Sequence, residues 1–220
     1  MRATDSFVPS AEAAFIAGVT QQQMNRLADE HLVPDSLLAQ EGGSRRFARI
    51  TAAWASFFFQ SDDWLVASAR KNILSELTAR VARSKSREDL IGLHDMAKDI
   101  DWMIVDPSIG LQLDFTAIVS KAFARAKVVD TADELITKID SVMGGKPCFK
   151  GTRLPIEIVL SSLEKGIPED RVLDEYSLTS DQLTAAQVYA QVHPQRGRPV
   201  RLGSAKPPAQ RRSSFSSTNA

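Results

Sequence analysis

The sequence predicts a mainly α-helical protein with small β elements, built from two helix-turn-helix-like domains and a disordered basic tail. Three observations lead to this fold class. Apolar residues recur at helical spacing through most of the 220-residue chain, between glycine and proline breaks. Residues 144–155 hold three glycines and two prolines, which together fix the backbone of a built turn. From Pro194 onward the chain is rich in Pro, Gly, Ser, Arg and Gln and has almost nothing to bury.

Composition bounds the class of protein. The hydrophobic fraction of 43% and the charged fraction of 25% are ordinary for a soluble globular chain. The single cysteine, Cys148, excludes an internal disulfide and fits a reducing compartment. No apolar run is long enough to span a bilayer, and the N-terminus lacks a secretory signal pattern. We therefore expect a cytoplasmic protein with no membrane partner.

Charge is divided unevenly along the chain. The 27 basic and 27 acidic residues balance overall, but six basic residues and no acidic one follow His193. The first 193 residues therefore hold the other 21 basic residues and all 27 acidic ones, a net charge of −6. A mildly acidic body with a purely basic tail indicates two surfaces with different partners.

Residues 1–60 predict a winged helix-turn-helix domain. Ser10 is a candidate cap for a first helix, Gly18 breaks that helix, and Thr20 can cap a second helix that runs to about Glu30. A glycine-tipped hairpin around residues 42–43 then forms a wing, and a third helix follows, for which Thr51 is a candidate cap.

The same residues resemble a known DNA-binding class. Gly18-Val19-Thr20, Leu32-Val33-Pro34 and Ser44-Arg45-Arg46-Phe47 are similar to the winged-helix domain of the MerR class, although Asn25 replaces its usual arginine and His31 its usual glycine. Glutamine and asparagine can read base edges, and arginines of a wing can contact phosphates, a role also open to Arg49. The predicted DNA-binding residues are Gln21, Gln22, Gln23, Asn25, Arg26, Arg45 and Arg46. The alternative is a solvated face, because residues 1–60 hold only five basic residues against six acidic ones.

Residues 61–129 predict an α/β connector that could also dimerise. An amphipathic helix is expected over about 63–81, a hairpin over 102–115 closed by Asp106-Pro107-Ser108, and a helix over about 114–126. Homodimerisation is expected from symmetric operator binding rather than from any residue of this segment.

Residues 130–193 predict a trihelical domain. Leu154-Pro155 opens a helix that Gly166 ends, Pro168 begins another that runs to Tyr176, and Thr179 caps the last. A turn precedes these helices, in which Lys150 and Arg153 are expected to hold neighbouring carbonyls or carboxylates. The predicted structural-turn residues are Gly144, Gly145, Pro147, Gly151, Thr152 and Arg153.

This turn resembles the signature Gly-Gly-x-Pro-x-x-x-Gly-Thr-Arg-x-Pro of an antitoxin family found beside PIN-domain ribonuclease toxins. The resemblance continues through residues 174–179, Tyr189-Ala190 and His193-Pro194, and into the Arg-Gly-Arg-Pro run of the tail. It implies a VapB-like antitoxin that inhibits a ribonuclease and is not itself an enzyme.

The tail, residues 194–220, is the predicted toxin-binding segment. PIN-type ribonucleases gather acidic side chains around a metal, and an arginine fork matches a carboxylate. The predicted toxin-binding residues are Pro194, Arg196, Gly197, Arg198, Pro199 and Arg201. Two alternatives stay open: a hook for the minor groove of A·T-rich DNA, or a solubilising tail.

The sequence offers little support for an enzymatic function. The three histidines are far apart, none has metal-ligand spacing with Cys148, and Gly144-Gly145-Lys146 lacks the spacing of a nucleotide P-loop. We therefore expect no catalytic residue, cofactor or metal. The predicted function is an antitoxin that inhibits a PIN-domain ribonuclease and represses its own operon, as a homodimer within a hetero-oligomeric complex. The rivals are a stand-alone DNA-binding transcriptional regulator with a minor-groove-binding tail, and a pure interaction adaptor.

Overall fold

In the computed structural model, the residues that the structure describes are 6–96, 99–107, 110–140 and 143–194. They form a mainly helical protein with small β elements, as the sequence predicts, and the strands make three small antiparallel sheets. The elements in chain order are β1 (Phe7–Pro9), α1 (Ser10–Ala17), α2 (Gln21–Asp29), η1 (Asp35–Leu37), β2 (Leu38–Glu41), β3 (Ser44–Ala48), α3 (Thr51–Gln60), α4 (Ala67–Arg83), α5 (Arg87–Gly92), β4 (Met103–Asp106), β5 (Leu111–Asp114), α6 (Thr116–Leu135), β6 (Ile136–Thr137), η2 (Met143–Gly145), β7 (Cys148–Phe149), α7 (Ile156–Glu164), α8 (Glu169–Tyr176) and α9 (Ser180–Val192).

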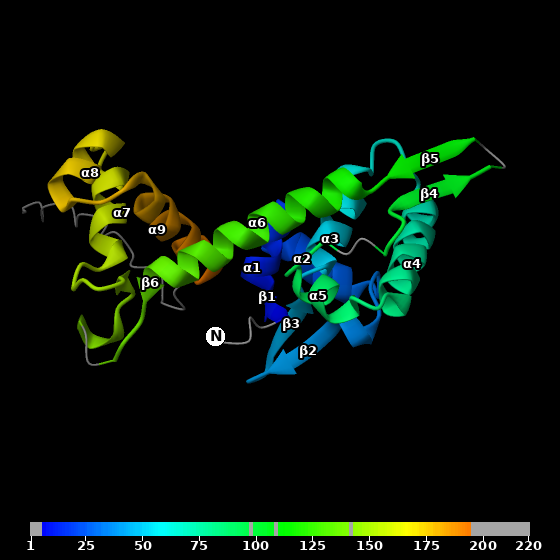
Figure 1. The fold of residues 1–220 in the computed structure, drawn as a ribbon, viewed down its shortest axis with the longest axis horizontal. Helices are drawn as coiled ribbons and strands as arrows, with labels where there is room; N and C mark the ends of the chain where they lie inside the picture. Colours follow the sequence, from blue (N-terminus) through cyan, green and yellow to red (C-terminus); the bar gives the residue numbers. More distant parts are fainter. Residues whose placement is uncertain (1–5, 97–98, 108–109, 141–142, 195–220) are drawn as a thin grey trace, which may run out of the picture.

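The molecule is elongated along α6, its longest helix (Figure 1). Helix α6 follows directly on the β4–β5 hairpin, passes α3 and α1, and leads at its other end through β6 into the group formed by α7, α8 and α9 (Figure 1). We call residues 6–60 the N-terminal unit and residues 136–194 the C-terminal unit. No helix in the described segments is both long and apolar enough to cross a membrane.

In the N-terminal unit α1 packs on a three-stranded sheet, and α2 packs on α1 and α3. Gly18 ends α1 in the left-handed conformation, with φ of 70°, and Thr20 begins α2 with a capping box that includes Gln23. The predicted hairpin is β2–β3, and β1, which the sequence did not predict, pairs with the other edge of β3. Hence β3 lies at the centre of the sheet.

Two predicted caps in this unit are wrong. Ser10 lies inside the first turn of α1, whose N-cap is Pro9. The Thr51 hydroxyl donates to the carbonyl of Ala48 at 2.6 Å, and no side chain caps α3. Both helices begin directly after a strand or a tight bend, so the preceding backbone fixes their start.

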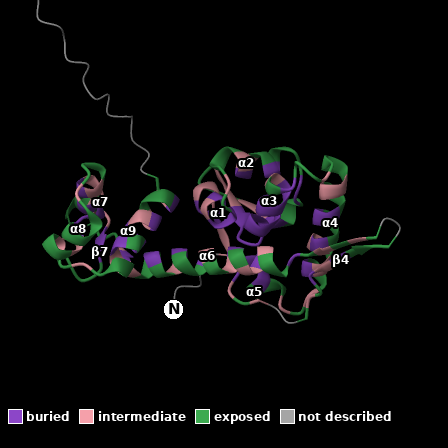
Figure 2. Ribbon diagram, turned by 90° about the horizontal axis from the view of Figure 1, so that it is seen from above, coloured by how far each residue is buried: buried purple, intermediate pink, exposed green. Residues whose placement is uncertain are grey.

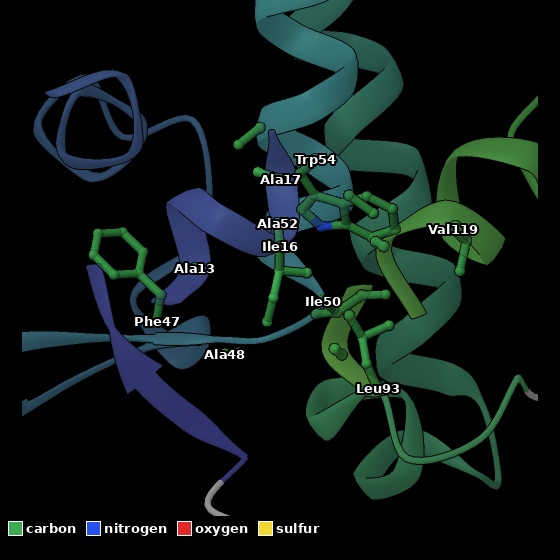
Figure 3. Close-up of a cluster of buried hydrophobic side chains, with 14 of the residues drawn as sticks. Ala13, Ile16, Ala17, Phe47, Ala48, Ile50, Ala52, Trp54, Leu93 and Val119 are labelled. Carbon is green, nitrogen blue, oxygen red and sulfur yellow. The ribbon is translucent and has the colours of Figure 1, made fainter. Parts of the chain in front are cut away.

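A single large core joins the N-terminal unit to the predicted connector. Figure 3 shows Ile16, Ile50 and Trp54 of the N-terminal unit on the side of this core that faces Leu93 and Val119, and all five are nearly inaccessible to solvent. Ring contacts cross the same boundary: Trp54 packs edge-on against Trp102 at 6.3 Å, and Phe57 against Phe115 at 4.7 Å. The connector is therefore packed into the main core.

The C-terminal unit has a second, smaller core. Its fully buried members come from β6, β7 and three helices, and they are Ile136, Phe149, Ile156, Val159, Val172, Leu183 and Ala186. Helix α9 contributes to both cores, since Ala185, Val188 and Val192 belong to the main core while Leu183 and Ala186 belong to the small one. In Figure 2, α9 lies close to α6.

Helix α6 is longer than the sequence predicted and crosses the expected boundary between residues 129 and 130. Its buried stripe, Val119, Ala122, Ala126 and Val129, continues at helical spacing to Ala132. Because this stripe packs first on the main core and then beside α9, the helix continues where the sequence suggested a change of domain.

Candidate nucleic-acid and partner interfaces

The predicted DNA-reading amides lie along α2 but differ in what they contact. Gln22 is exposed and makes no side-chain contact in the described part of the chain. The Gln21 amide donates to Ser10 Oγ at 2.7 Å. The Gln23 carbonyl oxygen accepts from the backbone and hydroxyl of Thr20, so this side chain maintains the helix cap. Gln21 and Gln22 are thus the two exposed amides of this group, and Gln22 is the one without a hydrogen bond to another described residue.

The predicted phosphate-binding arginines all have acidic partners. Arg26 pairs with Glu30 at 2.8 Å, and Arg46 pairs with Glu41. Arg45 of the β2–β3 hairpin pairs with Asp29 of α2 at 2.8 Å, which ties hairpin and helix together. These pairs are solvent-exposed on one side or both, so each contributes at most about 1 kcal/mol to stability. A phosphate could therefore replace such a carboxylate at small cost.

Arg49 is not a phosphate contact, contrary to the role considered for it from the sequence. Its side chain is 3% exposed. It donates twice to one oxygen of Glu12, at 3.0 and 2.8 Å, and once to Asp130 at 2.7 Å. A buried ion triad thus fastens α1 to α6 across the segment that follows β3.

Burial and charge act in opposite directions on this triad. Burial raises the pKa of Glu12 above its usual value, although the Arg49 guanidinium opposes the rise. For Arg49 burial favours loss of the proton, but the carboxylates of Glu12 and Asp130 outweigh it and raise the pKa. The arginine therefore stays charged, and its removal would leave two carboxylates without their partner.

A second polar contact fixes the end of α9, close to the triad. His193 Nε2 lies 3.0 Å from Asp133 Oδ1, one turn of α6 after Asp130. The His193 ring also packs on Tyr189, with centroids 4.3 Å apart. Pro194 follows at once, so the described chain ends beside the junction of α1, α6 and α9. Residues 195–220, with Arg196, Gly197, Arg198, Pro199 and Arg201, lie outside the described residues.

Pro194 lines an open hollow of about 550 Å³ at this junction. Gln21 of α2 lines the same hollow, together with Gly18 and Val19 of the α1–α2 turn. Pro194, the first residue of the predicted tail, therefore lies at the same hollow as Gln21, the first residue of the predicted DNA-reading helix. The sequence did not predict this proximity.

The glycine-rich turn is held by its own backbone. Gly144, Gly145 and Gly151 have φ values of 66°, 76° and 78°, where other residues are strained. The Thr152 hydroxyl donates to the carbonyl of Phe149 at 2.9 Å and accepts from the backbone of Leu154 at 3.1 Å. The predicted turn residues thus lie on both sides of β7: Gly144, Gly145 and Pro147 precede this strand, and Gly151, Thr152 and Arg153 follow it.

Two of the three cations between residues 144 and 155 do not behave as expected, while the third, Lys146, pairs with Glu157 at 2.9 Å. Lys150 and Arg153 are exposed, and their side chains hold no carbonyl or carboxylate in the described part of the chain. Arg153 instead lines a hollow of about 310 Å³ with Cys148, Thr137 and Ile139. A charge that the fold does not use is available to a partner. Within the described residues no group of three or more His, Cys, Asp or Glu side chains could hold a metal ion.

The chain is similar to a protein family and to a relative whose descriptions state no activity. Residues 136–190 match the model of a family described as a protein of unknown function, DUF433. The chain is 27% identical over 199 residues to the uncharacterized protein y4eO of Sinorhizobium fredii strain NBRC 101917 / NGR234, covering 90% of this chain and 86% of the relative. A crystal structure of Rv2018 from Mycobacterium tuberculosis aligns with 81% of this chain and 96% of its own, at 16% identity and a TM-score of 0.31.

Proposed function

We propose that this chain is a DNA-binding antitoxin of the VapB-like kind, with a MerR-like winged helix at its N-terminus. The N-terminal unit would bind operator DNA and repress the chain's own operon, and the C-terminal region would bind and inhibit a PIN-domain ribonuclease. The observation that carries the proposal is the separation of two units: one presents a helix and a wing, and the other ends where a purely basic tail begins.

The DNA-binding half rests on the α1–Gly18–α2 arrangement and on the wing bound to it. Arg45 links β3 to Asp29 and to the carbonyl of Asn25, so helix and wing form one surface. His31 has a φ of 51°, the conformation that the glycine usual in the MerR class adopts easily. Gln21, Gln22 and Arg26 are exposed on α2 and would meet the bases and phosphates. A homodimer would place two such surfaces on a symmetric operator.

The toxin-binding half rests on charge. The tail carries six basic residues and no acidic one, and it follows directly on Pro194, which is exposed. Arg196 and Arg198 would pair with the acidic side chains that hold the metal of a PIN-domain ribonuclease, because a guanidinium fork matches a carboxylate. Helices α8 and α9, joined through the left-handed Ser177, would form the second helix-turn-helix-like element and support this tail.

The test uses the protein encoded beside this one. Its metal-dependent RNA cleavage is measured alone, with the full chain, and with the full chain carrying Arg196→Gln and Arg198→Gln. We expect the full chain to block cleavage and the double variant to lose most of the inhibition while still binding DNA from upstream of its gene. A neighbour that neither binds the full chain nor is inhibited by it would refute the antitoxin half.

One observation favours the second candidate, a stand-alone regulator whose tail enters the minor groove. Pro194, the last residue that the structure describes, and Gln21 of α2 line the same hollow. The tail would then begin beside the DNA-reading helix. Under this candidate the double arginine variant loses DNA affinity and salt dependence, whereas under the antitoxin proposal it keeps both.

A further inference from the structure

Arg125 of α6 differs from the other arginines that the fold partly or fully buries. Each of those others donates to a carboxylate or a carbonyl, and they are Arg45, Arg46, Arg49, Arg70 and Arg80. Arg125 is half-buried as well, but its guanidinium makes no hydrogen bond or ion pair with any described residue. The fold thus holds one partly desolvated cation without an anion.

The position of this guanidinium is well defined. It lies over the ring of Phe15 at 4.9 Å. It also crosses the α1–α2 turn so closely that a Cβ atom at Gly18 would come within 2.6 Å of its Nη1. Gly18 has a φ of 70°, so the backbone conformation favours glycine there, and an added Cβ atom would displace the end of the Arg125 side chain.

The surroundings of Arg125 suit an anion. The guanidinium lines the open hollow of about 550 Å³ next to Gln21 of α2 and Gln191 of α9. Arg125 is the only charged residue among those that line this hollow in the described chain, and the two glutamines bring amide groups that can donate. The hollow is open to solvent and large enough to admit a phosphate group.

Energetics points the same way. Burial lowers the pKa of Arg125, with no nearby carboxylate to oppose the effect, yet an arginine remains protonated at physiological pH. A cation that has lost part of its hydration gains most from an oxyanion that accepts two hydrogen bonds from its fork. A bound phosphate would supply the partner that the fold omits.

We propose that Arg125, with Gln21 and Gln191 beside it, binds a phosphate group in this hollow, and that in the DNA complex this group is a backbone phosphate next to the start of α2. The proposal rests on the DNA binding proposed above and adds to it a contact from α6, outside residues 1–60. The competing explanation is structural: the carbonyl end of α1 and the Phe15 ring alone would hold the guanidinium.

The experiment measures DNA binding by the full chain at several salt concentrations. The probes are a duplex from upstream of its own gene and an unrelated duplex. We expect Arg125→Gln to weaken binding to both duplexes by a similar factor and to reduce the slope of log affinity against log salt by about 1, as for one lost phosphate contact. Arg125→Lys should keep the slope, because the charge remains. Lys71→Gln removes an equal charge from an exposed position on α4 and should leave both measurements unchanged.

Two further readouts separate the outcomes. Thermal unfolding identifies a structural role: an Arg125→Gln variant that melts earlier but keeps the wild-type affinity and salt slope overturns the site. The second readout is a titration of inorganic phosphate into the wild-type chain, in which the NMR signal of the Arg125 Nε–H group is followed. This signal is assigned by its absence from the spectrum of Arg125→Gln. If the wild type binds neither duplex, the proposed DNA binding fails. A phosphate-induced shift of the Arg125 signal would then assign the hollow to a free phosphate compound. If the signal does not shift either, the phosphate site is overturned as well.

Discussion

The N-terminal and C-terminal units use the same local devices but differ in how much core supports them. Helices α2 and α9 both begin with a threonine capping box, Thr20 with Gln23 and Thr179 with Gln182. The N-terminal unit shares a core with α4 to α6 that encloses Trp54, Phe47 and Phe115, whereas Phe149 is the one aromatic ring among the fully buried members of the small core. Local signals can therefore start equivalent helices, while the stability of each helix depends on the core behind it.

The two units also differ in what their charges contact. Every described arginine of the N-terminal unit is paired with a carboxylate of the chain. In the C-terminal unit Lys150, Arg153 and Arg171 are exposed and have no such partner among the described residues. Lys146 of the second unit does pair with Glu157, at 2.9 Å, so the contrast concerns the arginines. Those of the first unit organise the fold, and those of the second are available to a partner. The predictions that follow test this contrast.

The largest effect should come from Arg49→Met, which removes the arginine of the buried triad. Glu12 and Asp130 would lose the partner that compensates their burial, so we expect a loss of about 3–5 kcal/mol in the free energy of unfolding, measured by urea denaturation. Arg46→Met is the matched control, since Glu41 of its ion pair is exposed and loss of the pair should cost less than about 1 kcal/mol. Equal costs for the two variants would show that the triad does not link α1 to α6 energetically.

Leu183→Ala should weaken the small core without opening the main one. Removing a buried leucine side chain costs about 2–5 kcal/mol, and we expect the lower end because half-buried neighbours such as Leu160 and Leu163 can close on the space. Hydrogen exchange should quicken in α7, α8 and α9 and stay slow in α1 and α3. Ile158→Ala, at an exposed position of α7, should change stability by less than about 0.5 kcal/mol. Faster exchange throughout α1 and α3 would mean that the two cores unfold together.

The two capping boxes allow a smaller, paired test. Thr20→Ala and Thr179→Ala each remove one side-chain acceptor from a helix N-terminus, and each should cost about 1 kcal/mol. We expect the Thr20 variant to lower the free energy of global unfolding and the Thr179 variant to act mainly on local opening of α9, as seen by hydrogen exchange. Serine at either position should restore most of the loss. If Thr179→Ala lowers the free energy of global unfolding as much as Thr20→Ala does, the small core does not open before the main core, and the contrast between the two units is wrong.

The features that the sequence predicted are those that depend on neighbouring residues. Gly18, Thr20, Pro168 and Thr179 mark helix ends through backbone conformation and short hydrogen bonds, and the structure confirms each of them. The coarse fold class and both hairpins follow from the same kind of local pattern.

The features that it missed depend on residues far apart in the chain. Arg49 looked like a wing arginine, and only the fold shows that Glu12 and Asp130 surround it. Arg125 gave no signal at all, because its neighbours Gly18 and Phe15 come from another helix. One clue was present: Glu12 is a lone charge in the otherwise apolar α1, and a carboxylate on such a helix needs a buried partner.

Glu12 also gives the triad a dependence on pH, the smallest of the expected effects. Burial raises its pKa in the folded protein above the ordinary value of 4.5, so the folded state holds this proton more tightly than the unfolded chain does. Its contribution to stability is therefore complete below the unfolded value and declines as the pH rises through the folded one. Asp133 also raises the pKa of Glu12, while Arg49 and His193 lower it. The decline of stability with pH therefore depends on all of these charges at the junction of α1, α6 and α9.

The measurement is the free energy of unfolding of the wild type and of Glu12→Gln, from about pH 4 to about pH 8. Subtracting the variant removes carboxylates common to both proteins, such as Asp99 and Asp114, whose pKa values are lowered and whose pH dependence has the opposite sign. We expect the difference, wild type minus variant, to fall as the pH rises above the unfolded value and then to level off. A difference that grows with pH would mean that the attraction of Arg49 outweighs the effect of burial on the pKa of Glu12. Ionisation of Glu12 would then stabilise the folded protein instead of destabilising it.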